Sequence, residues 1–230
     1  MTRVKKPPVE RRAELMDCAQ ALFLSRGYEA TTVNDILARA GLSKGAFYHH
    51  FDSKEALLDA LTERMAARIV ADAEAIIGDA SRDALERLNA FLAQGRQWKV
   101  EQARLLRGMY EAVLKSENAA LYQRLVAAST RVVAPALTRL VEEGVRQGVF
   151  RPPAPALVAE VLLSLANARQ AVWLQAMADA EAGELDAAAE RLEARMADEA
   201  AVVERLLGVA PGAVVLVEPG FCRAILRAMC

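Results

Sequence analysis

Apolar residues recur at three- and four-residue intervals along almost the whole chain, which is the period of an amphipathic α-helix. The first such stripe predicts a helix over residues 9–26, and Gly27 follows it as a typical helix stop. Further stripes predict helices over residues 33–40, 44–50, 54–77, 81–92, 97–115, 118–147, 156–178 and 185–207. The pattern therefore predicts an all-α fold of about nine helices.

Two features interrupt this helical pattern. Pro135 lies inside the predicted helix 118–147, where it removes a backbone hydrogen bond and is expected to kink the helix. After Gly212 the run AVVLVEP is the only strand-like stretch, and its role is not predicted.

Charge and composition suggest two parts. Of 230 residues, 54% are hydrophobic and 26% are charged, which is enough for a sizeable core. The net charge of −1 argues against a protein that coats nucleic acid indiscriminately. Residues 1–54 nevertheless hold nine Lys/Arg and six Asp/Glu, a net of +3. This asymmetry suggests a nucleic-acid-facing part over residues 1–54 and a helical body with another role over residues 55–230.

Cysteine usage and hydropathy bear on the compartment. Cys18, Cys222 and Cys230 form no CxxC pair, which is typical of the reducing cytoplasm. The first residues have no apolar core of the kind found in secretory signals. We find no charge-free apolar run of 18 residues, and so expect no membrane span and a cytoplasmic protein.

Residues 31–54, TTVNDILARAGLSKGAFYHHFDSK, have the pattern of a helix-turn-helix, in which a tight glycine turn joins two helices and the second is short and exposed. A seven-residue helix is roughly 10 Å long, which suits a major groove about 12 Å wide. Once Phe47 and Phe51 are buried, the outward positions are those of Lys44, Gly45, Tyr48 and His49.

Thr32 and Ser43 are placed to cap these two helices, whose N-termini would then favour phosphate anions. The alternative is a small helical subdomain with a solvated polar face. The predicted helix 44–50 has no carboxylate, which favours DNA binding over that alternative.

About fifty residues, from Arg11 to Leu61, resemble the tetracycline-repressor-type (TetR) family of bacterial regulators. The resemblance rests on Arg26-Gly27-Tyr28, Thr31-Thr32, Ile36, Ala40-Gly41-Leu42-Ser43, Gly45, Phe47-Tyr48-His49-His50-Phe51 and Lys54. It implies a helix-turn-helix that binds operator DNA as a dimer, and a variable helical C-terminal domain that binds a small ligand.

Position by position, the resemblance implies phosphate contacts from Thr32, His50 and Lys54. It places Lys44, Gly45, Ala46, Tyr48 and His49 in the groove. Asn34 stands where the family often has Arg, and Ala46 where a hydroxyl residue is common, so both depart from the pattern. The complete set of implied DNA-binding residues is Thr32, Asn34, Ser43, Lys44, Gly45, Ala46, Tyr48, His49, His50 and Lys54.

The C-terminal part offers a dimer interface and an effector site. The helices predicted over 156–178 and 185–207 have apolar faces that could pair two subunits, or could belong to the subunit's own core. Bulky or polar groups in otherwise apolar helices are candidates for lining an effector site, although any one could be plain core. They are Trp98, Met109, Tyr110, Asn167, Gln170, Trp173 and Met177. The expected effector is apolar or amphipathic.

Enzyme chemistry is not predicted. The only histidines, His49 and His50, lie about 100° apart on a helix and cannot chelate one metal, and no phosphate-binding glycine loop appears. We expect no cofactor and no metal. The sequence thus predicts a ligand-responsive, homodimeric DNA-binding regulator, most consistent with a repressor; a helical protein-binding scaffold or a ligand-independent regulator are the alternatives.

Overall fold

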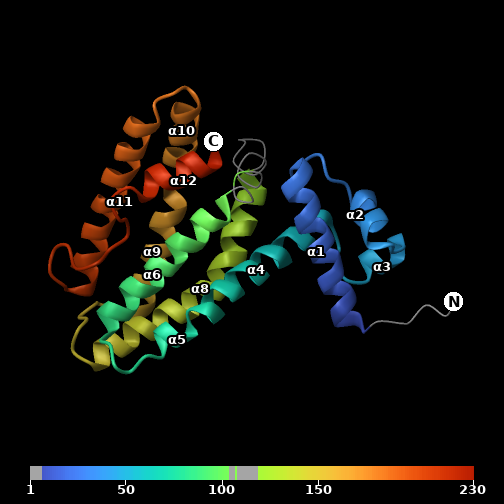
Figure 1. Ribbon diagram of the computed structural model, residues 1–230. Coiled ribbons are helices and arrows are strands. Elements are labelled where there is room, and N and C mark those ends of the chain that lie inside the picture. The colour runs from blue at the N-terminus through green and yellow to red at the C-terminus, as the bar shows by residue number, and fades with distance from the viewer. Residues whose placement is uncertain (1–6, 104–106, 108–118) are drawn as a thin grey trace. The chain divides into compact units, whose positions relative to one another are not determined.

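The computed structural model describes residues 7–103, 107 and 119–230, and these residues contain helices but no strand (Figure 1). The all-α prediction is therefore confirmed for the described part of the chain. The helices are α1 (Pro8–Arg26), α2 (Val33–Ala40), α3 (Lys44–Tyr48), α4 (Lys54–Asp72), α5 (Glu74–Ile77), α6 (Ala84–Glu101), α8 (Ala119–Arg146), α9 (Pro155–Ala168), α10 (Gln170–Glu181), α11 (Leu185–Leu207) and α12 (Phe221–Met229).

The chain forms two compact units. The N-terminal unit comprises Met1–Met65 and Arg104–Ala128, and the C-terminal unit comprises Ala66–Ala103 and Ser129–Cys230. The boundary falls inside α4 and inside α8, so both helices contribute to each unit. The functional division at residue 54 stays a prediction.

The N-terminal unit has its own hydrophobic core, built by one face each of α1, α2, α3 and α4. Leu15, Ile36, Phe47, Leu57 and Leu61 are fully buried there. This core fixes α2 and α3, the elements that the sequence predicts to bind DNA.

The core of the C-terminal unit is assembled from α6, α8, α9 and α11. Leu88, Leu140, Val158 and Val203 are fully or almost fully buried in it, and Phe150 packs beside them. Glycine is needed at position 144 of α8, since a Cβ there would lie 2.0 Å from the Phe150 ring.

The predicted helix 156–178 is in fact two helices, α9 and α10, which meet at Arg169. The Arg169 side chain is almost fully buried, and its Nε lies 2.6 Å from Oε2 of the buried Glu199 on α11. The partner is thirty positions away in the sequence, so helical periodicity alone could not place this charge inside the unit.

The apolar stripe of α11 packs within its own subunit. Ala189, Leu192, Met196 and Val203 are buried in the single chain. The structure thus favours the intramolecular alternative for this stripe, and any subunit contact of α11 must use another face.

The strand-like run after Gly212 is not a strand. Val214 and Leu216 are buried, while the backbone is bonded by side chains instead of a neighbouring strand. The Asn89 amide donates to the Ala213 carbonyl at 2.8 Å and accepts from the Val215 N–H at 2.9 Å. The segment leads into α12, a helix that the sequence analysis did not predict.

One segment of the described residues has the length and apolar composition of a membrane span, which by itself is weak evidence for one. Residues Pro155–Glu181 are long and apolar enough by length and composition, although core helices of soluble proteins pass the same test. Only 24% of the most apolar window is buried in the single chain. The segment also contains Arg169, which is paired inside the unit. Leu157 and Leu174 of this segment are exposed in the single chain.

Candidate DNA-binding site

The start of α2 is fixed by a reciprocal cap. The Thr32 hydroxyl accepts from the Asp35 N–H at 3.2 Å, and Asp35 accepts from the Thr32 N–H at 2.8 Å. The Thr32 hydroxyl and the Thr32 N–H both donate to the Asp35 carboxylate and lower the pKa of Asp35, and Arg26, 3.4 Å away, lowers it further. The predicted cap at Thr32 is confirmed.

A glycine turn connects α2 to α3. Gly41 has φ of 62°, a left-handed conformation that suits glycine, and Leu42 donates back to the Leu37 carbonyl at 3.1 Å. The Ser43 hydroxyl then accepts from the Ala46 N–H at 3.4 Å. The predicted caps and turn are therefore all present, in the order of a helix-turn-helix.

Two phenylalanines anchor α3. Phe47 is fully buried and Phe51 nearly so, with their ring centroids 5.8 Å apart. The helix is shorter than predicted, with five residues and His49 as its C-cap, so its length is about 7.5 Å. A rod of this length still fits the major groove.

The outward face of α3 is cationic and aromatic. Tyr48 is 49% exposed, and its ring meets Phe47 edge to face at 5.4 Å. The Lys44 ammonium lies 6.0 Å from the Tyr48 ring centroid, and His49 is exposed beside it. Gly45 is exposed too, so the backbone here is open to close approach.

His50 differs from His49. It is half-buried, and burial lowers the pKa of His50, as do the neighbouring His49 and Arg12. Its imidazole is consequently neutral near pH 7, which suits a hydrogen bond to phosphate better than a charge contact.

Lys54 is engaged inside the N-terminal unit. Its ammonium donates to the Tyr28 carbonyl at 3.1 Å and to the Thr31 carbonyl at 3.0 Å. It also lies 4.0 Å from the centroid of the Tyr28 ring. These contacts tie the loop between α1 and α2 to the start of α4, a role that the sequence analysis missed.

The remaining predicted DNA-binding residues lie around this face. Asn34 is exposed on α2, Ser43 is exposed at the turn, and Ala46 is half-buried. Thr32 is exposed, although its hydroxyl already donates to Asp35 at 2.6 Å. The predicted residues thus lie on α2, on α3, in the segments next to them and at the start of α4.

The structure does not bring the described members of the predicted effector set together at one site. Met109, Tyr110 and the side chain of Gln170 lie outside the described part of the structure. Of the others, Met177 is buried, and the last three are only partly buried: Trp98, Asn167 and Trp173.

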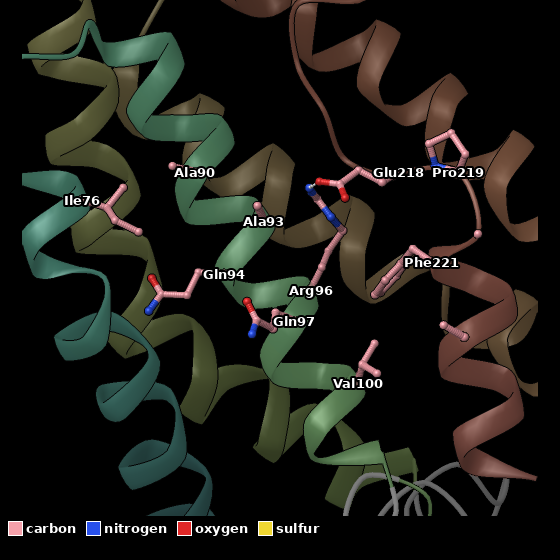
Figure 2. Close-up of a pocket in the computed structure, with 12 residues that line it drawn as sticks. Ile76, Ala90, Ala93, Gln94, Arg96, Gln97, Val100, Glu218, Pro219 and Phe221 are labelled. Carbon is pink, nitrogen blue, oxygen red and sulfur yellow. Dashed lines mark hydrogen bonds and ion pairs between the residues drawn. The ribbon is translucent and has the colours of Figure 1, made fainter.

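The C-terminal unit contains a surface groove of about 700 Å³ between α5, α6 and the segment before α12 (Figure 2). Ala93 and Phe221 contribute apolar surface, and Arg96 pairs with Glu218 at its side. None of the predicted effector residues lines it. The sequence offered no signal for this groove because one of its walls, residues 218–224, lies more than 110 positions from the other two.

Comparison with known proteins identifies the N-terminal pattern. A profile of bacterial regulatory proteins of the tetR family matches residues 15–61. The transcriptional repressor KstR2 of Mycolicibacterium smegmatis is 30% identical over 146 residues, covering 63% of this chain and 70% of that protein. KstR2 of Rhodococcus jostii is 57% identical over 49 residues, but these are 21% of this chain and only 24% of that protein.

The fold similarity extends through both units. The crystal structure of RolR without ligand aligns with a TM-score of 0.59, at 18% identity, over 94% of this chain and 96% of that one. At this identity the similarity establishes the fold alone.

Proposed function

Because the chain belongs to the TetR family of bacterial regulatory proteins, we propose that it represses transcription in the cytoplasm by binding a palindromic operator as a homodimer. A small effector would release it. The observation that carries the proposal is the outward face of α3. Lys44, Tyr48 and His49 are exposed there, while Phe47 is buried and fixes the helix to the core.

The chemistry of this face suits DNA. Lys44 can bind a phosphate or a guanine edge, and Tyr48 can contact a phosphate or a thymine methyl group. The caps at Thr32 and Ser43 hold α2 and α3 in the register that such contacts need. One subunit has contacts for one half-site, so reading a palindrome requires a second copy.

The uncovered face of α9 and α10 supports a dimer. Leu157 on α9 and Leu174 on α10 are 42% and 38% exposed, and Val202 on α11 is 39% exposed. Exposed apolar surface of this kind is typical of subunit interfaces. We propose that these helices, rather than the buried stripe of α11, pair the two subunits.

Effector release requires coupling between two sites. The helix α4 begins at Lys54 beside the candidate DNA-binding site and continues past Met65 into the C-terminal unit, so it could transmit a change. A ligand shifts operator affinity only through its different affinities for the two conformations, and a roughly 100-fold release needs about 2.7 kcal/mol of coupling.

The test begins with selecting genomic DNA fragments that the purified protein retains. The bound fragments should share one palindrome, with a salt-dependent affinity in the nanomolar range. Tyr48→Ala should then lower affinity for that palindrome by roughly 100-fold. Leu24→Ala is the matched control, since Leu24 is equally exposed, at 49%, but lies on α1.

Retention of full operator affinity by Tyr48→Ala would refute the assignment of α3. Selection of unrelated fragments without a shared sequence would refute operator recognition altogether. A monomer at working concentrations in the presence of the operator would overturn the dimer.

A further inference from the structure

Arg12 lies on α1 and its side chain reaches the segment that follows α3. The guanidinium carbon is 5.0 Å from the centroid of the Phe51 ring, which is almost fully buried. One guanidinium nitrogen, Nη1, is also 3.9 Å from the Met16 sulfur, one turn further along α1. A guanidinium stacked on a ring is held in place while the edge of its planar fork stays available for hydrogen bonds.

The Arg12 side chain has no carboxylate partner among the described residues. The neighbouring Arg11, by contrast, donates to Glu14 at 3.0 Å, and its side chain is only 20% exposed. Arg12 is exposed, and residues 1–6 contain no Asp or Glu that could pair with it. Most of the five N–H donors of Arg12 are thus available to an anion from solution.

His50 lies close to this guanidinium. Burial lowers the pKa of His50, and repulsion from His49 and then from Arg12 lowers it further, so Arg12 is near enough to act on the imidazole. The rings of His49 and His50 are 4.9 Å apart, and neither has a carboxylate partner in the described part of the chain. Nitrogen donors from α1 and from the end of α3 therefore gather without an acidic group to neutralise them.

This cluster of Arg12, His49 and His50 borders the face of α3 that is proposed to enter the major groove. Lys44 and Tyr48 lie within α3, whereas His50 comes after its C-cap and Arg12 belongs to another helix. Beyond the end of a short helix in the major groove lies the phosphate backbone, not the base edges. A guanidinium fork matches the oxygens of a phosphate, often with two parallel hydrogen bonds.

We propose that Arg12 binds a phosphate of the DNA backbone beside His50, so that α1 is part of the DNA-binding surface. The sequence analysis did not assign Arg12 to this surface. The inference rests on the proposed function in that the DNA would be the operator. A phosphate contact has no base preference of its own, so Arg12 adds affinity and fixes orientation for any sequence.

The substitution Arg12→Met tests this role against a purely structural one, the covering of the Phe51 ring. Methionine can still cover the ring but has no donors and no charge. We expect the variant to bind the selected operator and an unrelated duplex of the same length with equal losses, each roughly tenfold, the effect of one hydrogen bond to a charged group. The slope of log affinity against log salt should fall by about one charge.

Two further variants separate position and chemistry. Arg11→Met is the matched control, because the same change is made one residue away in a side chain that already pairs with Glu14. It should leave the salt slope unchanged. Arg12→Lys should also keep the slope, since the charge is retained, but should lose affinity because lysine lacks the planar fork.

A series of operator duplexes, each with one phosphate replaced by a neutral methylphosphonate, locates the contact. For the wild type, the replacement at the phosphate that Arg12 binds should lower affinity. The same replacement should have no further effect on Arg12→Met, and a reduced effect on His50→Ala. If every replacement affects Arg12→Met as it affects the wild type, Arg12 binds no particular phosphate and the proposal fails.

Other results would also overturn the proposal. It fails if Arg12→Met keeps the wild-type affinity and salt slope, or if Arg11→Met loses as much of both. A lower unfolding temperature of Arg12→Met with an unchanged slope would restrict Arg12 to covering the Phe51 ring. If Arg12→Met does not fold, Arg12→Lys still decides, because full affinity in that variant would show that the fork binds nothing.

Failure of this inference is distinguishable from failure of the proposed function. The unrelated duplex needs no operator, so the salt slope tests Arg12 even if the selected fragments share no palindrome. Conversely, an unchanged slope in Arg12→Met beside a loss of operator affinity in Tyr48→Ala would remove Arg12 from the surface and leave operator recognition by α3 standing.

Discussion

The helices α3 and α6 both carry polar groups, but they are held in opposite ways. The anchors of α3 are its own neighbours, since Ser43, Phe47 and Phe51 lie within nine consecutive residues. The polar groups of α6 are held by the far end of the chain. Asn89 bonds to Ala213 and Arg96 to Val215, across 124 and 119 positions.

This difference determines how amino-acid substitutions act in the two regions. In α3 the one buried residue, Phe47, is separate from the outward ones, so the outward residues can vary with the operator while the anchor stays. In α6 the contacts to residues 213–218 hold the helix and the tail together. A change in the tail is therefore also a change in the surroundings of α6.

The largest expected effect separates two adjacent residues of α3. Phe47→Ala removes a fully buried ring and should cost about 3–5 kcal/mol of unfolding free energy. Tyr48→Ala should change that free energy by less than about 1 kcal/mol while lowering operator affinity roughly 100-fold. Chemical denaturation of both variants, paired with operator titration, measures the two effects. If the two variants lose similar amounts of stability, the buried residue Phe47 and the outward residue Tyr48 do not have separate roles.

The next effect tests the long-range contacts of α6. Asn89→Ala leaves the Ala213 carbonyl and the Val215 N–H without their side-chain partner, which should cost about 1–3 kcal/mol. Hydrogen exchange should then increase at Val215 but remain unchanged across α3. If exchange at Val215 stays slow, other contacts suffice to hold the tail.

The difference between local and long-range contacts also decides which features could be predicted from the sequence. The caps at Thr32 and Ser43 and the burial of Phe47 could be predicted because their causes lie within a few residues. The burial of Arg169 could not be predicted, because its partner Glu199 lies on another helix.

The tail shows the same limit. Residues 213–217 have the composition of a strand, yet side chains of α6 and α11 satisfy their backbone groups. Asn89 and Glu204, which supply these hydrogen bonds, are ordinary polar positions in their own helices. Only the tertiary structure pairs them with the tail.

A smaller effect concerns Lys54, which makes contacts inside the N-terminal unit and is also predicted to contact a DNA phosphate. Lys54→Ala should cost about 1–2 kcal/mol because it removes two hydrogen bonds to carbonyl groups and the contact with the Tyr28 ring. If Lys54 also binds a phosphate, the salt dependence of DNA binding should fall by about one charge. Lys54→Met is the control, since it keeps the apolar stem. A changed base preference would instead mean that Lys54 reads sequence.

The smallest expected effect is a gain in stability at Gly95, which is compared with Gly144, a second glycine inside a helix of the C-terminal unit. Replacing glycine by alanine inside a helix stabilises it by up to about 1 kcal/mol when the methyl group fits. Gly95→Ala should therefore stabilise the protein, because its Cβ would enter open space. Gly144→Ala should destabilise it by about 1–3 kcal/mol, because its Cβ would meet the Phe150 ring at 2.0 Å. Urea denaturation of the pair measures both signs, and a loss of stability in Gly95→Ala would mean that the space beside α6 is filled.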